Sequence, residues 1–98
     1  MRKPDLEREH LAGMGGYQKI FRFANNRGAS VVRIPGLVPR GDGEELSQVI
    51  FVGPEILDMK SDFSYPTVRG GPEKIETWLA EIELLSPPTA EEIAGSEK

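Results

Sequence analysis

A chain of 98 residues is the size of one small domain, and the absence of cysteine excludes disulfides, thiolate metal sites and cysteine nucleophiles. No apolar run is long enough to span a membrane, and residues 1–10 are charged where a signal peptide is apolar, so we expect a soluble, cytoplasmic protein without membrane contact. The net charge of −4 is unevenly divided, because residues 1–40 hold eight basic and three acidic side chains and residues 41–98 hold four basic and thirteen acidic ones.

Residues 1–16 predict a segment that is flexible or loosely docked. Asp5 is a suitable cap for a short helix over residues 1–12, and Leu6 and Leu11 would give that helix a small apolar surface. Glycines among residues 13–16 then end any regular structure, because glycine loses the most backbone freedom on ordering.

Residues 17–24 and 29–34 predict two strands, because both runs are rich in aromatic or β-branched side chains. Between them, Asn25, Asn26 and Gly28 are residue types that tolerate a positive φ. The chain is therefore expected to fold back on itself as a β-hairpin.

The register of this hairpin decides which side chains reach the core. We expect a loop with an even number of residues, in which Ala24 lies opposite Ala29. The core face then holds the pairs Phe21–Val32, Phe23–Ser30 and Lys19–Ile34, and the outer face holds Arg22–Val31 and Ile20–Arg33. In this arrangement the phenylalanines face inward, while Arg22 and Arg33, with Arg27 at the tip, face the solvent.

Less regular strands are expected in the middle of the chain. Residues 46–52 predict a third strand, which ends at Gly53-Pro54 because proline cannot donate to a strand ladder. Residues 56–59 fit a short strand or a turn. A fourth, irregular strand is expected over residues 63–68.

A helix over residues 72–85 is the best-defined element. Pro72 suits the first helical position, and the apolar side chains then follow helical spacing: Ile75, Trp78, Leu79, Ile82 and Leu85. Trp78 lies on this stripe, so we interpret it as a packing residue. The proline pair that follows ends the helix.

Together these elements predict an α+β fold, with a small antiparallel sheet of three to four strands and one C-terminal helix packed on one face. Residues 17–86 are expected to form the single domain. The segment of residues 1–16 precedes it, and an acidic, flexible tail of residues 87–98 follows it.

Side chains that would support catalysis or metal binding are scarce. His10 is the only histidine, and it lies in the segment expected to be least ordered. Asp58 and Asp62 are spaced for one helical face, but two carboxylates alone are a weak metal signal. Residues 41–43 lack the lysine and helix start of a phosphate-binding loop. We therefore expect no enzymatic activity, no metal and no cofactor.

The basic candidate for a partner-binding surface lies on the hairpin. Arg22, Arg27 and Arg33 would suit phosphates or an acidic protein surface through bidentate contacts. Because aromatic side chains are missing from the same outer face, the pattern favours a protein partner over direct nucleic-acid binding. A solvated or internally paired face is the alternative interpretation.

The acidic candidate lies on the helix. Glu76, Glu81 and Glu83 fall off the apolar stripe and would make the exposed side of the helix acidic. Such a surface would compete for the basic groove of a nucleic-acid-binding effector. Attraction between the basic and acidic halves of one fold explains the same charge division without a partner. A homodimer that pairs through an exposed sheet edge is a further alternative.

The stretch from Phe21 to Arg33 resembles a group of small bacteriophage and prophage proteins. These proteins carry a phenylalanine-rich strand, an Ala-Asn-Gly-type turn, an Ala-Ser-Val strand as at residues 29–31, and a short C-terminal amphipathic helix, and the likeness extends more loosely over residues 65–85. This chain differs at Asn26 and Arg27, where the group has glycine and tyrosine.

The group has no established activity, so the resemblance implies a context more than a mechanism. It implies a phage accessory protein that binds and occludes a macromolecular partner without catalysis, such as an inhibitor of a host defence system of the anti-CRISPR kind. A phage structural or assembly subunit, or a protein that binds nucleic acid through the basic hairpin, are the alternatives.

Overall fold

The computed structural model describes residues 3–11, 16–33, 43–62 and 65–96. Its elements in chain order are β1 Leu6–Leu11, β2 Gly16–Arg22, β3 Arg27–Arg33, β4 Glu44–Phe51, β5 Met59–Ser61, β6 Val68–Gly70, α1 Pro72–Glu83 and α2 Ala90–Ser96. The predicted α+β class with an antiparallel sheet is confirmed. The sheet has six strands in the described part of the chain, however, where three to four were expected.

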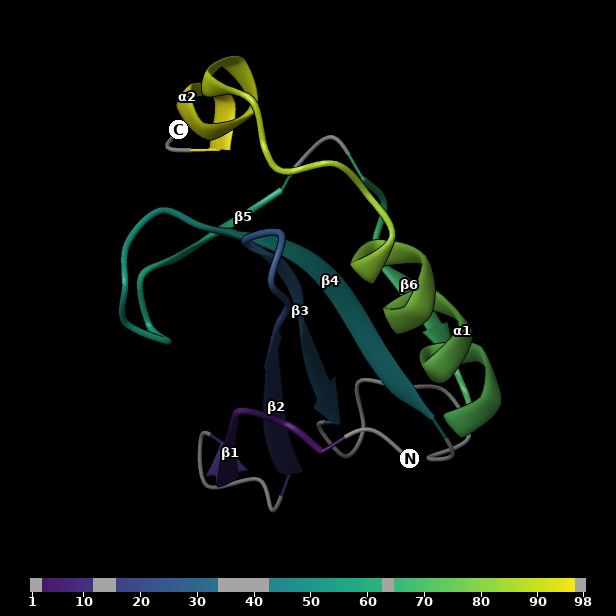
Figure 1. The fold of residues 1–98 in the computed structure, drawn as a ribbon. Coiled ribbons are helices and arrows are strands. Elements are labelled where there is room, and N and C mark those ends of the chain that lie inside the picture. The colour runs from purple at the N-terminus through teal and green to yellow at the C-terminus, as the bar shows by residue number, and fades with distance from the viewer. Residues whose placement is uncertain (1–2, 12–15, 34–42, 63–64, 97–98) are drawn as a thin grey trace.

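The strands follow the order β1-β2-β3-β4-β5, and β6 also pairs with β4. β5 pairs with residues 49–51 and β6 with residues 44–46, so the two short strands lie end to end along one edge of β4. Figure 1 shows α1 against one face of this sheet and α2 at the far end, beside β5. Within the described residues, neither helix combines the length and apolar character needed to cross a membrane.

The expected N-terminal helix is wrong, because residues 6–11 form β1. This strand pairs antiparallel with β2, from Leu6 opposite Ile20 to Leu11 opposite Gly16. A helix with two leucines would bury little surface, whereas the edge of β2 offers backbone groups for a ladder and places Leu6 in an apolar cluster. The side chain of His10 and residues 12–15 lie outside the described part of the chain.

The β2–β3 hairpin forms, but the predicted register is wrong. Phe21 lies opposite Ala29 instead of Val32, and the loop of residues 24–26 has an odd number of residues. The backbone N–H of Phe23 closes this loop by donating to the carbonyl of Arg27 at 2.9 Å.

A positive φ at Asn26 explains the shorter turn. Its φ of 61° is the left-handed conformation that asparagine adopts more readily than most residues. Gly28 is therefore not needed in the turn and lies within β3. There a Cβ atom would overlap the carbonyl oxygen of Phe21 and lie 2.8 Å from the ring of Phe51. Glycine at this position allows the Phe51 ring to pack against the strand.

The main core lies between the sheet and α1. The buried residues of this cluster are Phe21, Phe23, Ala29, Val31, Leu46, Ile75, Leu79 and Ile82, with Val68 and Trp78 packed against them. The inward orientation of the two phenylalanines and the packing role of Trp78 are confirmed. Burial of the α1 stripe fixes which side of the helix faces the solvent.

A second, smaller cluster lies on the opposite face of the sheet. Ile20, Val49 and Phe51 are buried there, because successive side chains of a strand point to opposite faces. Leu6 from β1 and Ile56 from the β4–β5 connection help to cover them. The sheet is thus apolar on both faces at the end where the hairpin turns.

The C-terminal residues differ from the expected flexible tail. α1 ends at Glu83, two residues before the predicted end, and residues 90–96 form the short helix α2. The side chain of Arg27 at the hairpin tip contacts this segment at Ser86 and Glu92 and holds it in place.

Candidate functional site

The three arginines of the basic candidate do not form one surface. Arg22 ends β2 on the face away from α1, whereas Arg27 and Arg33 stand at opposite ends of β3 on the α1 face. The expectation that Arg27 faces the solvent at the tip is wrong, because this residue is only 3% exposed. The odd-numbered loop reverses its orientation, so that it points into the protein.

Arg22 ties the hairpin to the β4–β5 connection. Its guanidinium lies over the ring of Phe51, 4.7 Å from the ring centre. The same group donates to the carbonyl of Pro54 at 3.0 Å and to Oδ1 of Asn26 at 3.2 Å. The face of the guanidinium and its N–H donors are therefore both engaged by groups of the protein itself.

Arg33 lies in a separate environment, beside a surface pocket of about 290 Å³ that Tyr17 and Glu44 also line. The phenol of Tyr17 donates to Oε2 of Glu44 at 2.6 Å, and Nζ of Lys19 lies 3.7 Å from that oxygen. Burial and this hydrogen bond raise the pKa of Tyr17 to about 12. The phenol therefore stays protonated at neutral pH and is not a base there.

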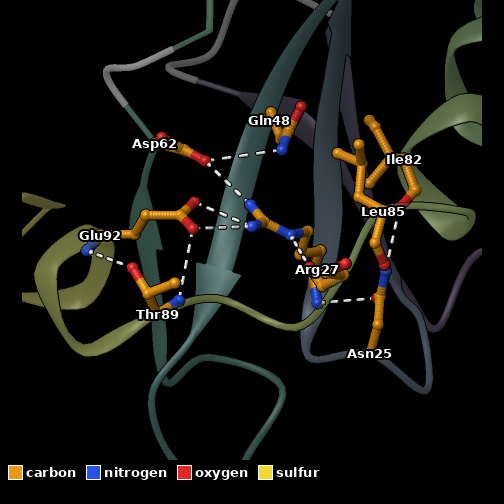
Figure 2. Close-up of polar contacts among 9 residues, drawn as sticks. Asn25, Arg27, Gln48, Asp62, Ile82, Leu85, Thr89 and Glu92 are labelled. Atoms are coloured by element: carbon orange, nitrogen blue, oxygen red, sulfur yellow. Dashed lines mark hydrogen bonds and ion pairs between the residues drawn. The ribbon is translucent and has the colours of Figure 1, made fainter.

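Arg27 is the centre of a buried polar network, drawn in Figure 2. Its Nη1 lies 3.4 Å from Oδ2 of Asp62, and its Nη2 donates to both carboxylate oxygens of Glu92, at 2.8 and 3.1 Å. Its Nε donates to the carbonyl of Ser86 at 2.6 Å. One guanidinium thus joins β3, the end of β5 and the segment that leads into α2.

Asp62 is buried in this network, at 5% exposure, and the amide of Gln48 lies 3.5 Å from the carboxylate oxygen that faces Arg27. Two carboxylates near one buried guanidinium offset the loss of its hydration. Within the described residues, every buried side-chain nitrogen and oxygen atom has a hydrogen-bonding partner.

Glu92 caps α2 in addition to binding Arg27. Its Oε1 accepts from the backbone N–H of Thr89 at 3.3 Å, and its own N–H donates to Oγ1 of Thr89 at 3.1 Å, a reciprocal capping box. The hydrogen bond from Arg27 is the main cause that lowers the pKa of Glu92. The carboxylate therefore stays charged and oriented toward the guanidinium.

Asn25 completes the arrangement at the other side of the turn. Its Nδ2 donates to the carbonyls of Ile82 at 3.0 Å and Leu85 at 2.8 Å, which are carbonyls at the end of α1. Its Oδ1 accepts from the N–H of Arg27 at 3.0 Å. We call Asn25 and Arg27 the hairpin clamp, because together they hold the end of α1 and the start of α2.

The sequence carried one signal for this clamp. Thr89 and Glu92 match the spacing of a capping box, which marks a helix start in a stretch that composition alone assigned to a flexible tail. Nothing in the local sequence around Asn25 indicates that it caps a helix about 60 residues further along the chain.

The acidic candidate lies on the predicted helix, but only two of its three glutamates are exposed as predicted. Glu81 and Glu83 are exposed on α1, and Glu76 is half-buried. The backbone carbonyl of Glu83 also lies 3.4 Å from Nδ2 of Asn25. Leu84, directly after the helix, is 85% exposed, more than the other exposed large apolar side chains of the described residues, Leu57 and Val52. Glu81, Glu83 and Leu84 lie at the C-terminal end of α1, whereas Glu76 lies near the N-terminal end of the helix.

The candidates for chemistry do not converge. Among the residues that the structure describes, the acidic and histidine side chains form no group suited to a metal ion. Asp58 accepts from the backbone N–H of Glu55 at 2.9 Å, and Asp62 binds Arg27, so the two aspartates have separate structural contacts. Residues 41–42 lie outside the described part of the chain.

Comparison of the chain with protein-family models, curated proteins and solved structures returned no match.

Proposed function

We propose that the protein is a non-enzymatic binding protein that occludes a basic surface of a macromolecular partner with the C-terminal end of α1. The observation that supports this proposal is the placement of Glu81, Glu83 and the 85% exposed Leu84 together at that end. The three side chains combine negative charge with an apolar contact, which is the composition that a cationic protein surface with an apolar centre recognises.

The position of these glutamates at the C-terminal end of α1 opposes folding of the helix. The C-terminal end of a helix carries partial negative charge, so each glutamate there opposes the helix by roughly 0.3–1 kcal/mol. The last turn of α1 carries no basic residue to compensate. A feature that opposes stability and exposes a leucine is more easily understood as part of a binding surface than as part of the fold.

The internal contacts of the arginines support the acidic surface over the basic hairpin. Arg27 is neutralised by two carboxylates, and Arg22 is engaged by backbone carbonyls and the Phe51 ring. Arg27 is buried and is therefore not presented to solvent as a phosphate-binding group, whereas Glu81 makes no ion pair within the described residues.

The partner that suits this surface is a protein with a basic groove, such as a nucleic-acid-binding effector. Long-range attraction between the acidic α1 face and such a groove would speed association and block access by DNA or RNA. The resemblance of the hairpin to phage and prophage proteins is consistent with a cytoplasmic inhibitor of a host defence system, of the anti-CRISPR kind.

Affinity capture with paired charge-reversal variants tests this proposal. The immobilised chain is exposed to lysate from its source cell at low and moderate salt, beside the variants Glu81→Lys/Glu83→Lys and Glu7→Lys/Glu55→Lys. Both variants change the net charge equally, but only the first alters the α1 surface. Lysine side chains at a helix C-terminus interact favourably with the helix dipole and stabilise the helix. Loss of the helix would therefore not explain weaker binding by the first variant.

We expect one partner to be retained by the unmodified chain and by the Glu7/Glu55 control, and to be lost by the α1 variant and at higher salt. DNA or RNA should then compete with the chain for the purified partner. Enrichment of no specific protein, or equal capture by both variants, would refute the proposal.

A homodimer through the sheet edge is the competing arrangement. Within the described residues, β1 pairs only with β2 and is an end strand of the sheet, the kind of strand to which a second copy would pair. A symmetric pairing centred on Arg8 would place Arg8 opposite Arg8 and Glu7 opposite Glu9, and like charges directly opposite are destabilising. Light scattering across a concentration series should therefore report a monomer, and a stable dimer would favour the assembly alternative.

A further inference from the structure

Residues 86–96, which we call the C-terminal strap, pack against the rest of the protein far less closely than α1 does. α1 buries Ile75, Leu79 and Ile82, whereas none of residues 86–94 is buried. Figure 1 shows the chain leaving α1 and crossing to α2 at the far end of the sheet.

The strap has little apolar contact to hold it in place. Ile93 is its largest apolar side chain, and it borders an open pocket of about 380 Å³ together with Phe51 and Val52. A seven-residue helix is also too short to be stable by itself in water. α2 therefore depends on whatever attaches it to the sheet.

That attachment is concentrated on Arg27. The guanidinium donates to the carbonyl of Ser86 at the start of the strap and to both carboxylate oxygens of Glu92 within α2. The two sides of this contact differ, because the Arg27 side chain is 4% exposed and the Glu92 side chain is 26% exposed. Glu92 can therefore leave toward water while Arg27 keeps its contact with Asp62.

We propose that the C-terminal strap undocks from the sheet as a unit while β1–β6 and α1 stay folded, with the Arg27–Glu92 ion pair as its latch. Opening exposes the buried guanidinium of Arg27 and melts α2. Among the described elements the strap is thus the least stable unit, and one charged contact sets the population of its docked state.

Amide hydrogen exchange on the full chain tests the latch, with a matched control in the same helix. Glu92→Gln removes the charge from the latch and keeps a side chain that can still cap α2. Glu91→Gln removes the same charge from a neighbouring exposed residue outside the network. Exchange is followed for peptides from the strap, α1 and β3, with and without added sodium chloride.

We expect Glu92→Gln to speed exchange in the strap about tenfold or more, because a hydrogen bond between charged groups contributes more to stability than one with a neutral partner. Strap amides should stay far less protected than those of α1 and β3 in every variant, and Glu91→Gln should match the unmodified chain. Salt should speed strap exchange in the unmodified chain and have little effect in Glu92→Gln.

Three results would overturn the proposal. An unprotected strap in the unmodified chain would mean that no docked state is populated. Strap amides as well protected as those of α1 and β3 would mean that the strap opens only when the whole fold unfolds. Equal exchange in the two variants would mean that Glu92 is not the latch.

Discussion

Replacing Arg27 by methionine should destabilise the protein strongly, because the change leaves the Asp62 carboxylate buried without its guanidinium. The side chains of Arg27 and Asp62 are 4% and 3% exposed, so neither is solvated in the folded state. Breaking a buried pair by removing one partner costs about 3–5 kcal/mol. A domain of this size is stable by roughly 5–15 kcal/mol, so the variant loses a large part of its stability.

A second substitution separates this cause from a simple loss of packing. Arg27→Met combined with Asp62→Leu removes both buried charges and leaves Glu92 free to turn to the solvent. We expect the double variant to recover at least about half of the loss, since a buried pair replaced by apolar residues is often close to neutral.

Urea unfolding followed by the fluorescence of Trp78, the single tryptophan, provides the measurement. Asp62→Leu alone completes the double-mutant cycle. The reasoning is refuted if Arg27→Met costs less than about 1 kcal/mol, or if the double variant is no more stable than Arg27→Met.

Three further predictions concern single positions. In the folded chain the pKa of Glu92 lies below its ordinary value of 4.5, so its contact stabilises the fold above that pH and is lost as pH falls through the folded-state pKa; the urea midpoint should drop there, and Glu92→Gln should flatten the drop. Gly28→Ala should cost about 1–3 kcal/mol in urea unfolding because its Cβ overlaps the Phe21 carbonyl, whereas Gly71→Ala, with open space around it, should change stability by less than about 1 kcal/mol. Tyr17→Phe should remove a phenol titration near pH 12 from an ultraviolet absorbance titration, and loss of a titration near the ordinary pKa of 10.0 instead would contradict the raised pKa.

Features with a local cause could be predicted from the sequence. The alternation of side chains along β2 placed Phe21 and Phe23 on the core face even though the register was wrong, because one residue in two points inward at any register of that strand. The helical period similarly placed Glu81 and Glu83 on the solvent side of α1.

Features set by distant contacts could not be predicted in the same way. The burial of Arg27 depends on Asp62 and Glu92, which lie 35 and 65 residues further along the chain. The strand conformation of residues 6–11 depends on the free edge of β2 and not on their own propensity. The odd loop depends on Asn26 taking the positive φ that the sequence offered equally to Gly28.

The order of synthesis determines when the contacts of the hairpin clamp can form in the nascent chain. At a synthesis rate of 5–20 residues per second, Glu92 is added about 3–13 s after Arg27, since 65 residues separate them. Asp62 is added about 2–7 s after Arg27. During translation the guanidinium therefore meets its first carboxylate well before the second. The hairpin tip stays accessible to chaperones, or to other chains, until the ribosome has made the residues that close over it.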